Sequence, residues 1–569
     1  MYIHTIPNRN SPPAILLRES YRENGKTKNK TITNISHWPP DRIEGLRRLL
    51  KGEKLISVDD AFEKVSSLQH GHVKAVLSAM ERLGFAKLLA SRRSRQRNIV
   101  AAMVAWRIIK PDSKLAMQRT WKDTTLPAQL GIEGADEDDL YAAMDWLVER
   151  QERIEKKLAR RHLTEGGLVM YDLSSSYFEG TKCKLAKLGH NRDGKKGKLQ
   201  VNYGLLTDQR GCPVSVSVFD GNTGDPKTLL PQAEKVRTRF GVGEMVLVGD
   251  RGMISQKQID ALKETDGVAW LTALKTGAIR SLTEGGCIQL GLFDERGLFE
   301  LEHPDYPGER LVACRNPELA KLRAHKRESL LAATAKELEK VRRTAGKGKL
   351  KTAAAIGVRA GKVVNKYKVA KHFDLDIRDD AFGFAVNEAS VTAEAALDGI
   401  YVVRTSVPAT RMDADDVVRS YKNLSRVERA FRSLKTVDLK VRPIHHHDEE
   451  RVRAHIFLCM LAYYVEWHMR EALRPLLFED EDQEAKATRD PVAPAKRSGK
   501  ALEKIATKRT EDDLEAHSFR TLIDHLGGIV RNSCKRKGDG EDAPADVIIE
   551  TTPDPIQQRA FDLISQLAV

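Results

Sequence analysis

The hydrophobic pattern divides the first 165 residues into a hairpin and a run of helices. Residues 14–36 contain two short strand-like runs around a polar Asn-Gly turn, which is typical of a β-hairpin. Apolar residues then recur at helical spacing. This spacing predicts helices over 41–51, 58–66, 72–90, 96–108, 138–147 and 149–162. We therefore expect a largely helical N-terminal region, residues 1–165, that begins with a hairpin.

The period of the pattern changes from helix to strand at residue 167. The runs GLVMYDLSS, KLQVNYGLLTD and PVSVSVFDG are joined by short turns and predict an antiparallel meander. A helix over 226–240, a buried strand over 244–250 and a helix over 255–265 follow. The order β-β-β-α-β-α is typical of ribonuclease-H-like folds, so we predict an α/β protein with the first part of such a core at residues 166–266.

The pattern changes again after residue 266. Short strand-like runs occupy 268–315, and Asn316-Pro317 predicts the start of a helix that continues to about 344. We expect a mainly β insertion domain at 267–396 that also holds this helix and a basic run. A strand over 397–406 and helices over 413–436 and 448–470 predict the second part of the core at 397–475. A charged linker and a small helical C-terminal region are expected at 476–569.

Charge adds a class of partner to this picture. The 569 residues include 95 Lys and Arg against 80 Asp and Glu, for a net charge of +15. This balance favours a polyanionic partner such as nucleic acid over an acidic small molecule. The segment Gly346 to Lys371 holds eight Lys or Arg and no acidic residue. We interpret it as a DNA contact rather than as an ordinary solvated face.

A second basic cluster, RRSRQR, lies between two predicted helices of the N-terminal region. It is a candidate phosphate contact, and the alternative is an ordinary solvated loop. The cluster contains Arg92, Arg93, Arg95 and Arg97.

The cysteines and the apolar runs indicate where the chain acts. The six cysteines are scattered, with no CxxC spacing that would suggest zinc or a redox pair, and so predict a reducing cytoplasm. The N-terminus lacks a cationic segment followed by an apolar one. The longest apolar run, Ile456 to Val465, is half the length that a membrane span needs. We expect a cytoplasmic protein that does not associate with membranes.

Three acidic residues stand where acids are costly. At about 100° per residue, Glu428 shares a helical arc with Tyr421 and Phe431, so its carboxylate is predicted to face inward. Asp172 lies in the middle of an apolar strand. Asp250 ends the most apolar strand of the region, where a residue of this kind often only starts a turn.

These acids are best explained together, as oxygen ligands of divalent metal. Mg²⁺ accepts a few carboxylates together with waters and phosphate oxygens. Two such ions about 3.5–4 Å apart activate a water or a sugar hydroxyl and stabilise the leaving oxygen. The set therefore predicts phosphodiester transfer, and the charge of the metal compensates the buried carboxylates.

The segment YKNLSRVERAFRSLK (421–435) resembles the Tyr-Arg-Glu-Lys signature of cut-and-paste DDE transposases of bacterial insertion sequences. Its glutamate follows the tyrosine by seven positions and its lysine by fourteen. YDLSSSYFEG and VLVGDRGM are similar to the segments that carry the first and second aspartates of the family. The resemblance covers residues 165–470 convincingly. It departs from the pattern at Leu424, where the family has arginine.

The resemblance implies a ribonuclease-H-like transposase with a β insertion domain. Asp172, Asp250 and Glu428 would be catalytic and would bind two Mg²⁺ ions, with Mn²⁺ as a substitute. Its partners would be double-stranded DNA, both the terminal inverted repeats and the target, bound at the bacterial nucleoid by a homodimer in a synaptic complex. Tyr421 and Lys435 would contact the phosphate backbone, and Arg426 or Arg432 would replace the missing arginine. The alternatives are a metal-dependent nuclease without strand transfer and a non-catalytic DNA-binding descendant.

Overall fold

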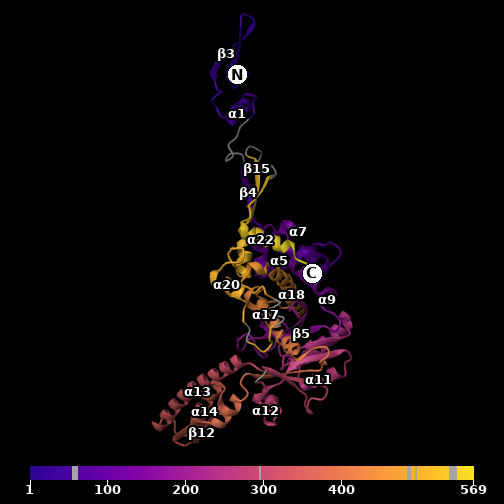
Figure 1. The fold of residues 1–569 in the computed structure, drawn as a ribbon, viewed down its shortest axis with the longest axis vertical. Helices are drawn as coiled ribbons and strands as arrows, with labels where there is room; N and C mark the ends of the chain where they lie inside the picture. Colours follow the sequence, from indigo (N-terminus) through magenta and orange to yellow (C-terminus); the bar gives the residue numbers. More distant parts are fainter. Residues whose placement is uncertain are drawn as a thin grey trace. The chain divides into compact units, whose positions relative to one another are not determined.

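The chain forms two compact units in the computed structural model (Figure 1). The structure describes residues 1–9, 11–53, 62–293, 296–482, 489–493, 496–536 and 547–568. The smaller unit consists of residues 1–68 and 530–552, and the larger unit of residues 69–529 and 553–569. The N-terminal region that we predicted at 1–165 is therefore not a single unit, because residues 69–165 belong to the larger one.

The described residues of the smaller unit form two three-stranded sheets and one helix, α1 (Pro40–Leu50). The first sheet has the order β1 (Tyr2–Ile6), β2 (Ala14–Glu23), β3 (Lys26–Asn34). It confirms the predicted hairpin, since Asn24 and Gly25 have φ values of +51° and +73°, as a tight two-residue turn requires.

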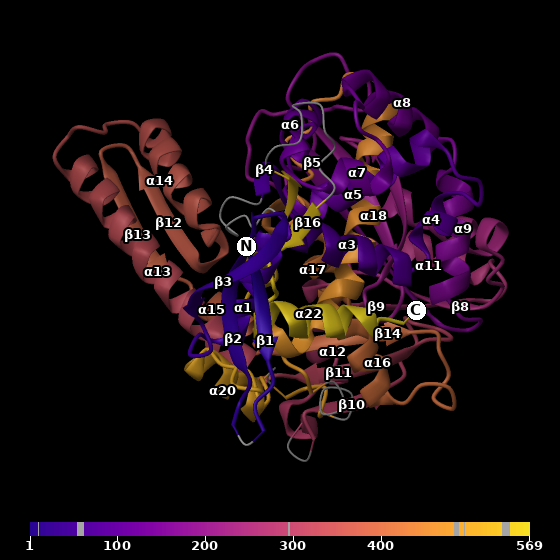
Figure 2. The same cartoon turned by 90° about the horizontal axis from the view of Figure 1, so that it is seen from above.

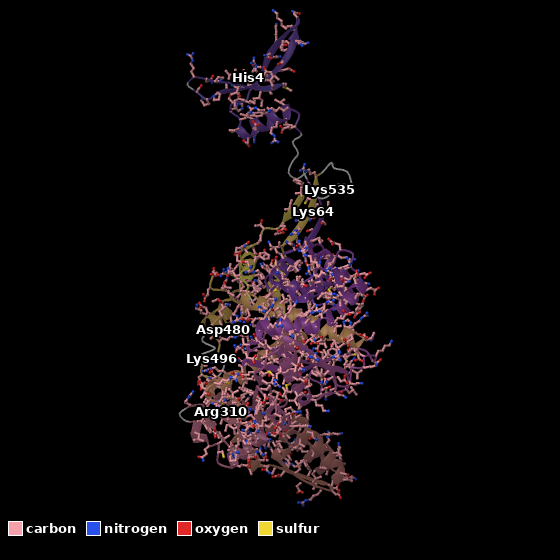
Figure 3. The ribbon with its side chains drawn as sticks, turned by 90° about the vertical axis from the view of Figure 1, so that its right-hand side faces the viewer. His4, Lys64, Arg310, Asp480, Lys496 and Lys535 are labelled. Atoms are coloured by element: carbon pink, nitrogen blue, oxygen red, sulfur yellow. The ribbon has the colours of Figure 1, made fainter. Side chains whose placement is uncertain are left out.

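The second sheet has the order β16 (Val547–Glu550), β15 (Val530–Arg536), β4 (Phe62–Gln69). Lys64 of β4 and Lys535 of β15 are labelled in Figure 3. The helix predicted over 58–66 is wrong from residue 62 onward, and its first part lies outside the described residues. The strand forms because it pairs with β15, which is remote in sequence and leaves no trace in the local pattern.

Seven helices described between residues 71 and 162 begin the larger unit. The predicted helix over 72–90 is interrupted at Gly84, whose φ is +60°, and the structure adds two short helices that the pattern did not predict. Helices α5 and α8 pack against the long helix α18 (Glu449–Leu473). The seven are α3 (Gly71–Arg82), α4 (Phe85–Leu89), α5 (Arg95–Ile109), α6 (Lys114–Thr120), α7 (Leu126–Leu130), α8 (Glu137–Val148) and α9 (Gln151–His162).

One eight-stranded sheet forms the centre of the larger unit, in the order β10-β11-β14-β9-β8-β5-β6-β7. Strands β5, β6 and β7 form the predicted antiparallel meander, and β8 and β9 then add in parallel beside β5. This arrangement fits the ribonuclease-H-like prediction. The five strands are β5 (Leu168–Tyr177), β6 (Gln200–Thr207), β7 (Pro213–Asp220), β8 (Met245–Val248) and β9 (Val268–Ala273).

Three helical segments connect these strands. Helix α10 (Pro226–Glu234) and the turn η2 (Lys235–Phe240) lead from β7 to β8. Helix α11 (Gln256–Lys263) leads from β8 to β9. The elements therefore follow the predicted order up to residue 266.

The predicted insertion domain at 267–396 is not mainly β. Strand β9 belongs to the core, and β10 (Leu298–Leu301), β11 (Arg310–Arg315) and β14 (Ile400–Thr405) extend the same sheet. Helix α12 (Thr276–Glu284) and the 3-10 turn η3 (Leu290–Phe293) lie between β9 and β10, within the range 268–315 where only short strand-like runs are expected.

The remainder of this region is mostly helical and has its own apolar core, which includes Leu338, Ile356 and Phe373. Helices α13 and α14 lie beside the hairpin β12-β13 (Figure 2). The basic run from Gly346 to Lys371 falls largely on α14. The elements are α13 (Pro317–Gly346), α14 (Ala353–Tyr367), η4 (Ala370–His372), β12 (Phe373–Arg378), β13 (Ala381–Val386) and α15 (Glu388–Ala395).

Helices complete the chain after β14. Although α18 is long, no helix of the described residues is long and apolar enough to cross a membrane. Residues 479–515, predicted as a linker, contain the helix α20. The elements are α16 (Ala414–Lys422), α17 (Leu424–Arg432), η5 (Ser433–Val437), α18, η6 (Arg474–Leu476), α20 (Gly499–Thr507), α21 (Phe519–Leu526) and α22 (Pro555–Ser565).

A buried ion pair connects β14 to the loop before β11. Arg404 donates from Nη2 to Oε1 of Glu309 at 2.5 Å and from Nε to Oε2 at 2.6 Å. The Glu309 side chain is fully buried and also accepts from Trp270 Nε1 at 3.3 Å. The pair is therefore tightly matched, and removal of one partner would leave a buried, unpaired charge.

We expect Arg404→Met to lower the free energy of unfolding by about 3–5 kcal/mol, because Glu309 loses its cation. The double variant Arg404→Met/Glu309→Leu should recover much of this loss. Urea unfolding of wild type, of the single variants Arg404→Met and Glu309→Leu and of the double variant measures both effects. As a control, Arg378→Met breaks an exposed pair with Asp376 and should cost less than about 1 kcal/mol. A double variant whose loss equals the sum of the two single losses would contradict the expectation.

Candidate active site

Asp172 lies in the middle of β5, where the sequence places it, and is partly buried. Its Oδ1 accepts the N–H of Leu173 at 2.7 Å. The pKa of the Asp172 carboxyl is raised to about 7, mainly by burial, and the neighbouring carboxylates of Asp250 and Glu428 contribute to the shift. Arg192 acts in the opposite direction. The structure thus brings the three predicted acids within electrostatic reach of one another.

Asp250 follows β8 by two residues and is exposed. Strands β5 and β8 are parallel neighbours, and Met170 lies opposite Val248. Asp172 and Asp250 each come two residues after this last pair, and the Asp250 carboxylate lies close enough to Asp172 to raise its pKa. Asp250 also accepts the N–H groups of Gly252 and Met253 at 3.0 and 2.8 Å. It therefore closes a turn as well, as its position at a strand end suggested.

Glu428 lies on α17, which packs against β5, but its side chain is exposed. The prediction that it faces inward is wrong. The buried arc of the helix is centred on Val427, Ala430 and Leu434, so Glu428 lies outside it. The segment is also not one continuous helix, since α16 ends at Lys422 and α17 passes into the wider turn η5. The single 100° projection therefore misplaced the arc.

Tyr421 is the first residue of the segment 421–435 and lies in the last turn of α16. Its side chain is partly buried beside the acids. Burial raises the pKa of the Tyr421 hydroxyl to about 12, and the negative charges of Asp250 and Glu428 contribute to the shift. Arg251, next to Asp250 in the chain, opposes it. Arg251 is an exposed cation beside the acids that the sequence analysis did not single out.

The three carboxylates fit divalent metal by their chemistry. They are hard oxygen donors, and the charges of Asp250 and Glu428 add to burial, the main cause, in raising the pKa of Asp172. The oxygen atoms of the three carboxylates are not as close together as the ligand atoms of a second group of residues. In the described part of the chain, only His162, Cys212 and His468 bring three such ligand atoms all within 4.8 Å of one another.

Lys435 reaches β5 from η5. Its Nζ donates to Ser174 Oγ at 2.9 Å and forms an ion pair with Asp193 Oδ1 at 2.9 Å. Ser174 is two residues beyond Asp172 and so shares its face of the strand. Lys435 therefore lies near the face of β5 that carries Asp172.

Asp193 is a site residue that sequence reasoning missed. It lies in the loop GHNRDGKKGK between β5 and β6, and only 2% of its side chain is exposed. Besides Lys435 it pairs with Arg442 and accepts the N–H of Tyr177 at 3.0 Å. The signal that could have identified it is an acid within a basic, glycine-rich loop.

A buried network of hydrogen bonds and ion pairs connects η5 to α18. Ser433 donates to Asp438 at 3.0 Å and to Glu466 at 2.9 Å. Arg470 of α18 donates to the same two acids, at 2.7 Å each. Because these charges are mutually paired, α18 can hold the turn that carries Lys435 in one position.

The predicted basic residues have different surroundings. Arg426 is partly buried and donates to the carbonyl oxygen of Gln209 at 3.0 Å, which fastens α17 to the turn between β6 and β7. Burial lowers the pKa of its guanidinium. Arg432 is exposed.

In the RRSRQR cluster, Arg92 and Arg93 are exposed, whereas Arg95 pairs with Asp139 at 2.9 Å. Arg97 is buried and donates to the carbonyl oxygen of Ala90 at 3.3 Å. The prediction that Arg97 contacts phosphate is therefore wrong for this structure, because the helix α5 turns that side chain inward.

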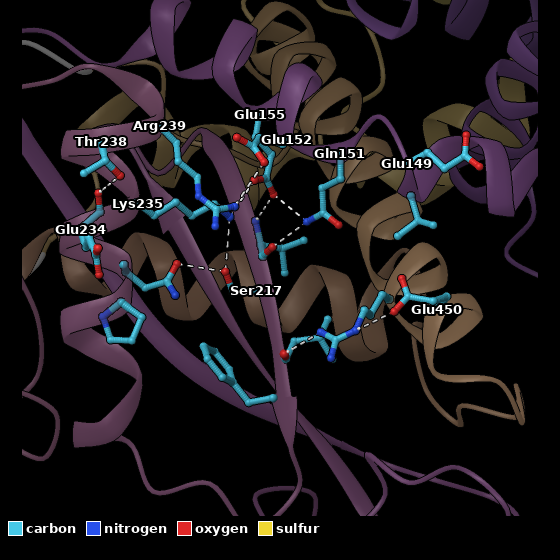
Figure 4. Close-up of a pocket in the computed structure, with 17 residues that line it drawn as sticks. Glu149, Gln151, Glu152, Glu155, Ser217, Glu234, Lys235, Thr238, Arg239 and Glu450 are labelled. Atoms are coloured by element: carbon cyan, nitrogen blue, oxygen red, sulfur yellow. Dashed lines mark hydrogen bonds and ion pairs between the residues drawn. The ribbon is translucent and has the colours of Figure 1, made fainter.

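A cavity of about 600 Å³, drawn in Figure 4, contains none of the three acids. It lies between α9 and the edge strand β7. Its polar groups pair with each other. Lys235 bonds Glu155 at 2.7 Å, and Glu155 accepts the N–H of Val216 at 3.1 Å. Side chains of α9 thus cover β7, the edge strand of the sheet. This packing accounts for the polar lining of the cavity without a bound ligand.

Two family models match the sequence. The transposase DDE domain matches residues 172–465, a span that begins at Asp172 and contains Asp250 and Glu428. The N-terminal domain of the IS1634 family transposases matches residues 3–59.

Among solved structures, the piggyBac transposase synaptic complex with hairpin DNA is similar at 9% sequence identity, over 80% of this chain and 77% of that chain, with a TM-score of 0.33. No curated protein matches the sequence. The DDE domain profile spans more than half of the chain, and the N-terminal profile matches separately. The chain therefore belongs to the DDE transposases of insertion sequences.

Proposed function

We propose that this transposase cleaves DNA at the ends of its element and joins the freed 3′-hydroxyl to target DNA. The observation that supports the proposal is that Asp250, which follows the strand β8 beside β5, and Glu428 on α17 both lie close enough to Asp172 to raise the pKa of its carboxyl. Water would hydrolyse one phosphodiester at the element's end. The released hydroxyl would then displace a bridging oxygen in the target, so that one phosphodiester replaces another without ATP.

Asp172, Asp250 and Glu428 would hold two divalent ions, Mg²⁺ or Mn²⁺ in its place. When bound, such ions supply the Lewis acidity that activates the attacking oxygen and stabilises the leaving one. The chain's own contribution is to hold the three carboxylates in place. Asp250 is oriented by two backbone N–H groups, and α17 carries Glu428 against β5.

Cationic and phenolic groups around the acids would position the phosphate backbone. Lys435, held by Ser174 and Asp193, stands next to Asp172 on β5. Tyr421 lies beside Asp250 and Glu428, and Arg251 near it can take the place of the family arginine that is Leu424 here. Arg432, which is exposed, would contact the DNA further away.

Other surfaces would bind the rest of the DNA. We propose Arg92 and Arg93, together with the basic helix α14, as backbone contacts, since each presents exposed cations. We also propose that the protein acts as a homodimer on double-stranded DNA, because two element ends must be joined to one target.

Cleavage and joining are tested with purified protein, DNA carrying the element's end and Mg²⁺. Asp172→Asn, Asp250→Asn and Glu428→Gln should each reduce nicking by at least about 1,000-fold, because each removes a metal ligand. Their DNA binding should persist. Glu179→Gln, a surface change, is the matched control.

Pre-cleaved ends with a 3′-hydroxyl separate transposition from the alternatives. A wild-type protein that nicks but never joins these ends would be a nuclease. One that binds ends and does neither would be a DNA-binding descendant. Each result overturns the proposal.

The raised pKa of Asp172 predicts a pH-dependent stability. The folded protein holds the Asp172 proton up to about pH 7, while the unfolded chain releases it near pH 4, so metal-free protein loses stability as pH rises between these values. Asp172→Asn should therefore be more stable than wild type at pH 8, by on the order of 1–3 kcal/mol, with no difference near pH 3.5. Thermal unfolding without metal measures this.

Divalent metal should reverse the difference in stability between wild type and Asp172→Asn. At pH 8, Mg²⁺ favours the ionised carboxylates and should raise the unfolding temperature of wild type but not of Asp172→Asn. An equal response of both proteins to Mg²⁺ would argue against a role for Asp172 as a ligand.

Asp193 is expected to act by positioning Lys435. Asp193→Asn removes the charge that holds both Lys435 and Arg442, so the rate of end cleavage should fall about 10-fold or more. Glu179→Gln, which breaks the exposed pair with Lys198 near the same loop, should leave the rate unchanged.

The salt dependence of end binding distinguishes positioning from loss of fold. If Lys435 leaves the phosphate, the dependence of binding on salt should become shallower in Asp193→Asn while its unfolding temperature stays close to wild type. A lower unfolding temperature with an unchanged salt dependence would show a purely structural role.

A further inference from the structure

Three side chains with metal-binding chemistry meet away from the acidic residues. His162 ends α9, Cys212 follows the turn between β6 and β7, and His468 lies on α18. Their ligand atoms all lie within 4.8 Å of one another. Cys212 Sγ is 3.8 Å from His468 Nε2. The ring centres of the two histidines are 5.6 Å apart.

These distances approach those of a zinc site. Zinc–sulfur bonds of about 2.3 Å and zinc–nitrogen bonds of about 2.0–2.1 Å put sulfur and nitrogen about 3.5 Å apart in a tetrahedral centre. The observed 3.8 Å between Cys212 and His468 is close to that separation. A small inward movement of side chains would complete the geometry.

We propose that His162, Cys212 and His468 bind a transition metal of the zinc class, with Zn²⁺ as the preferred ion. One thiolate and two imidazoles are a borderline-soft donor set that selects Zn²⁺ over Mg²⁺. A water would occupy the fourth position. This site is separate from the carboxylates, which are hard donors suited to Mg²⁺.

The surroundings of the cluster suit such a site. Cys212 is completely buried and His468 is 6% exposed. The carboxylate of Asp208 accepts the N–H groups of Arg210 and Cys212 at 2.8 and 2.9 Å, which fixes the turn that presents the thiol.

Metal binding would release one existing contact of His162. Arg210 donates to its Nδ1 at 3.2 Å, and its Nε2 bonds Tyr464 at 3.1 Å. The Arg210 side chain is 52% exposed and is already paired with Asp208, so it can withdraw from the ring at small cost. The positive charge that the metal adds is partly cancelled by the thiolate.

The metal site would stabilise the elements that support α17, the helix that carries Glu428. It joins α9, the β6–β7 turn and α18, which are remote in sequence. Arg426, two residues before Glu428, donates a hydrogen bond to Gln209 in the same turn. Gly211 of that turn also lies against Arg426. A metal here would therefore stabilise the surface on which α17 rests, without contact with the reacting DNA.

Metal content and a cobalt spectrum test the proposal. Full-length protein dialysed against metal-free buffer should retain about one zinc ion per chain, and Cys212→Ser and His468→Gln should retain less than a tenth of that. With Co²⁺ in place of zinc, wild type should show a thiolate-to-cobalt charge-transfer band that Cys212→Ser lacks. A zinc-selective chelator in excess Mg²⁺ should lower the unfolding temperature of wild type by several degrees.

Cys459→Ser is the matched control, because Cys459 is equally buried and lies 4.0 Å from one histidine, His455. This variant should keep the zinc ion, the cobalt band and the response to chelator. The proposal is overturned if wild type holds no zinc and gives no thiolate–cobalt band, or if Cys212→Ser and wild type hold equal amounts. Should Cys212→Ser fail to fold, the wild-type spectrum and the zinc content of His468→Gln decide in the same way.

Discussion

Like charges repel more strongly as water is removed, and Asp172, Asp250 and Glu428 come together where one of them is largely withdrawn from water. Burial and the two neighbouring carboxylates hold the pKa of Asp172 near neutrality. This repulsion works against folding, so the rest of the larger unit has to maintain the arrangement. The register between β5 and β8 fixes two of the acids, and the packing of α17 on β5 supplies the third.

Buried ion pairs stabilise the elements that carry these groups. Asp193 joins the β5–β6 loop to η5 through Lys435, and Arg470 joins η5 to α18 through two acids. Such pairs contribute little net stability when they replace apolar contacts, but they specify one geometry. A site that must align phosphate oxygens benefits from that specificity more than from added stability.

Two kinds of metal-binding side chain lie near the elements that contact helix α17. The carboxylates beside α17 offer hard oxygens, while the turn beneath it offers a thiol flanked by imidazoles. Hard and borderline-soft donors select different ions, so a catalytic and a structural metal would not compete. The helix that bears Glu428 would then be held by β5 on one side and by the β6–β7 turn on the other.

The sequence by itself determined the features that depend on short segments. Asn24-Gly25 specifies its turn, the alternation of apolar residues specifies the meander, and the spacing within 421–435 identifies Glu428. Tertiary structure decided what depends on distant partners. It paired β4 with β15, merged the strands of the expected insertion into the central sheet, buried Arg97, exposed Glu428 and brought Asp193 to Lys435. The reason is physical, since local pattern encodes backbone preference, whereas burial and ion pairing arise only when remote segments exclude water together.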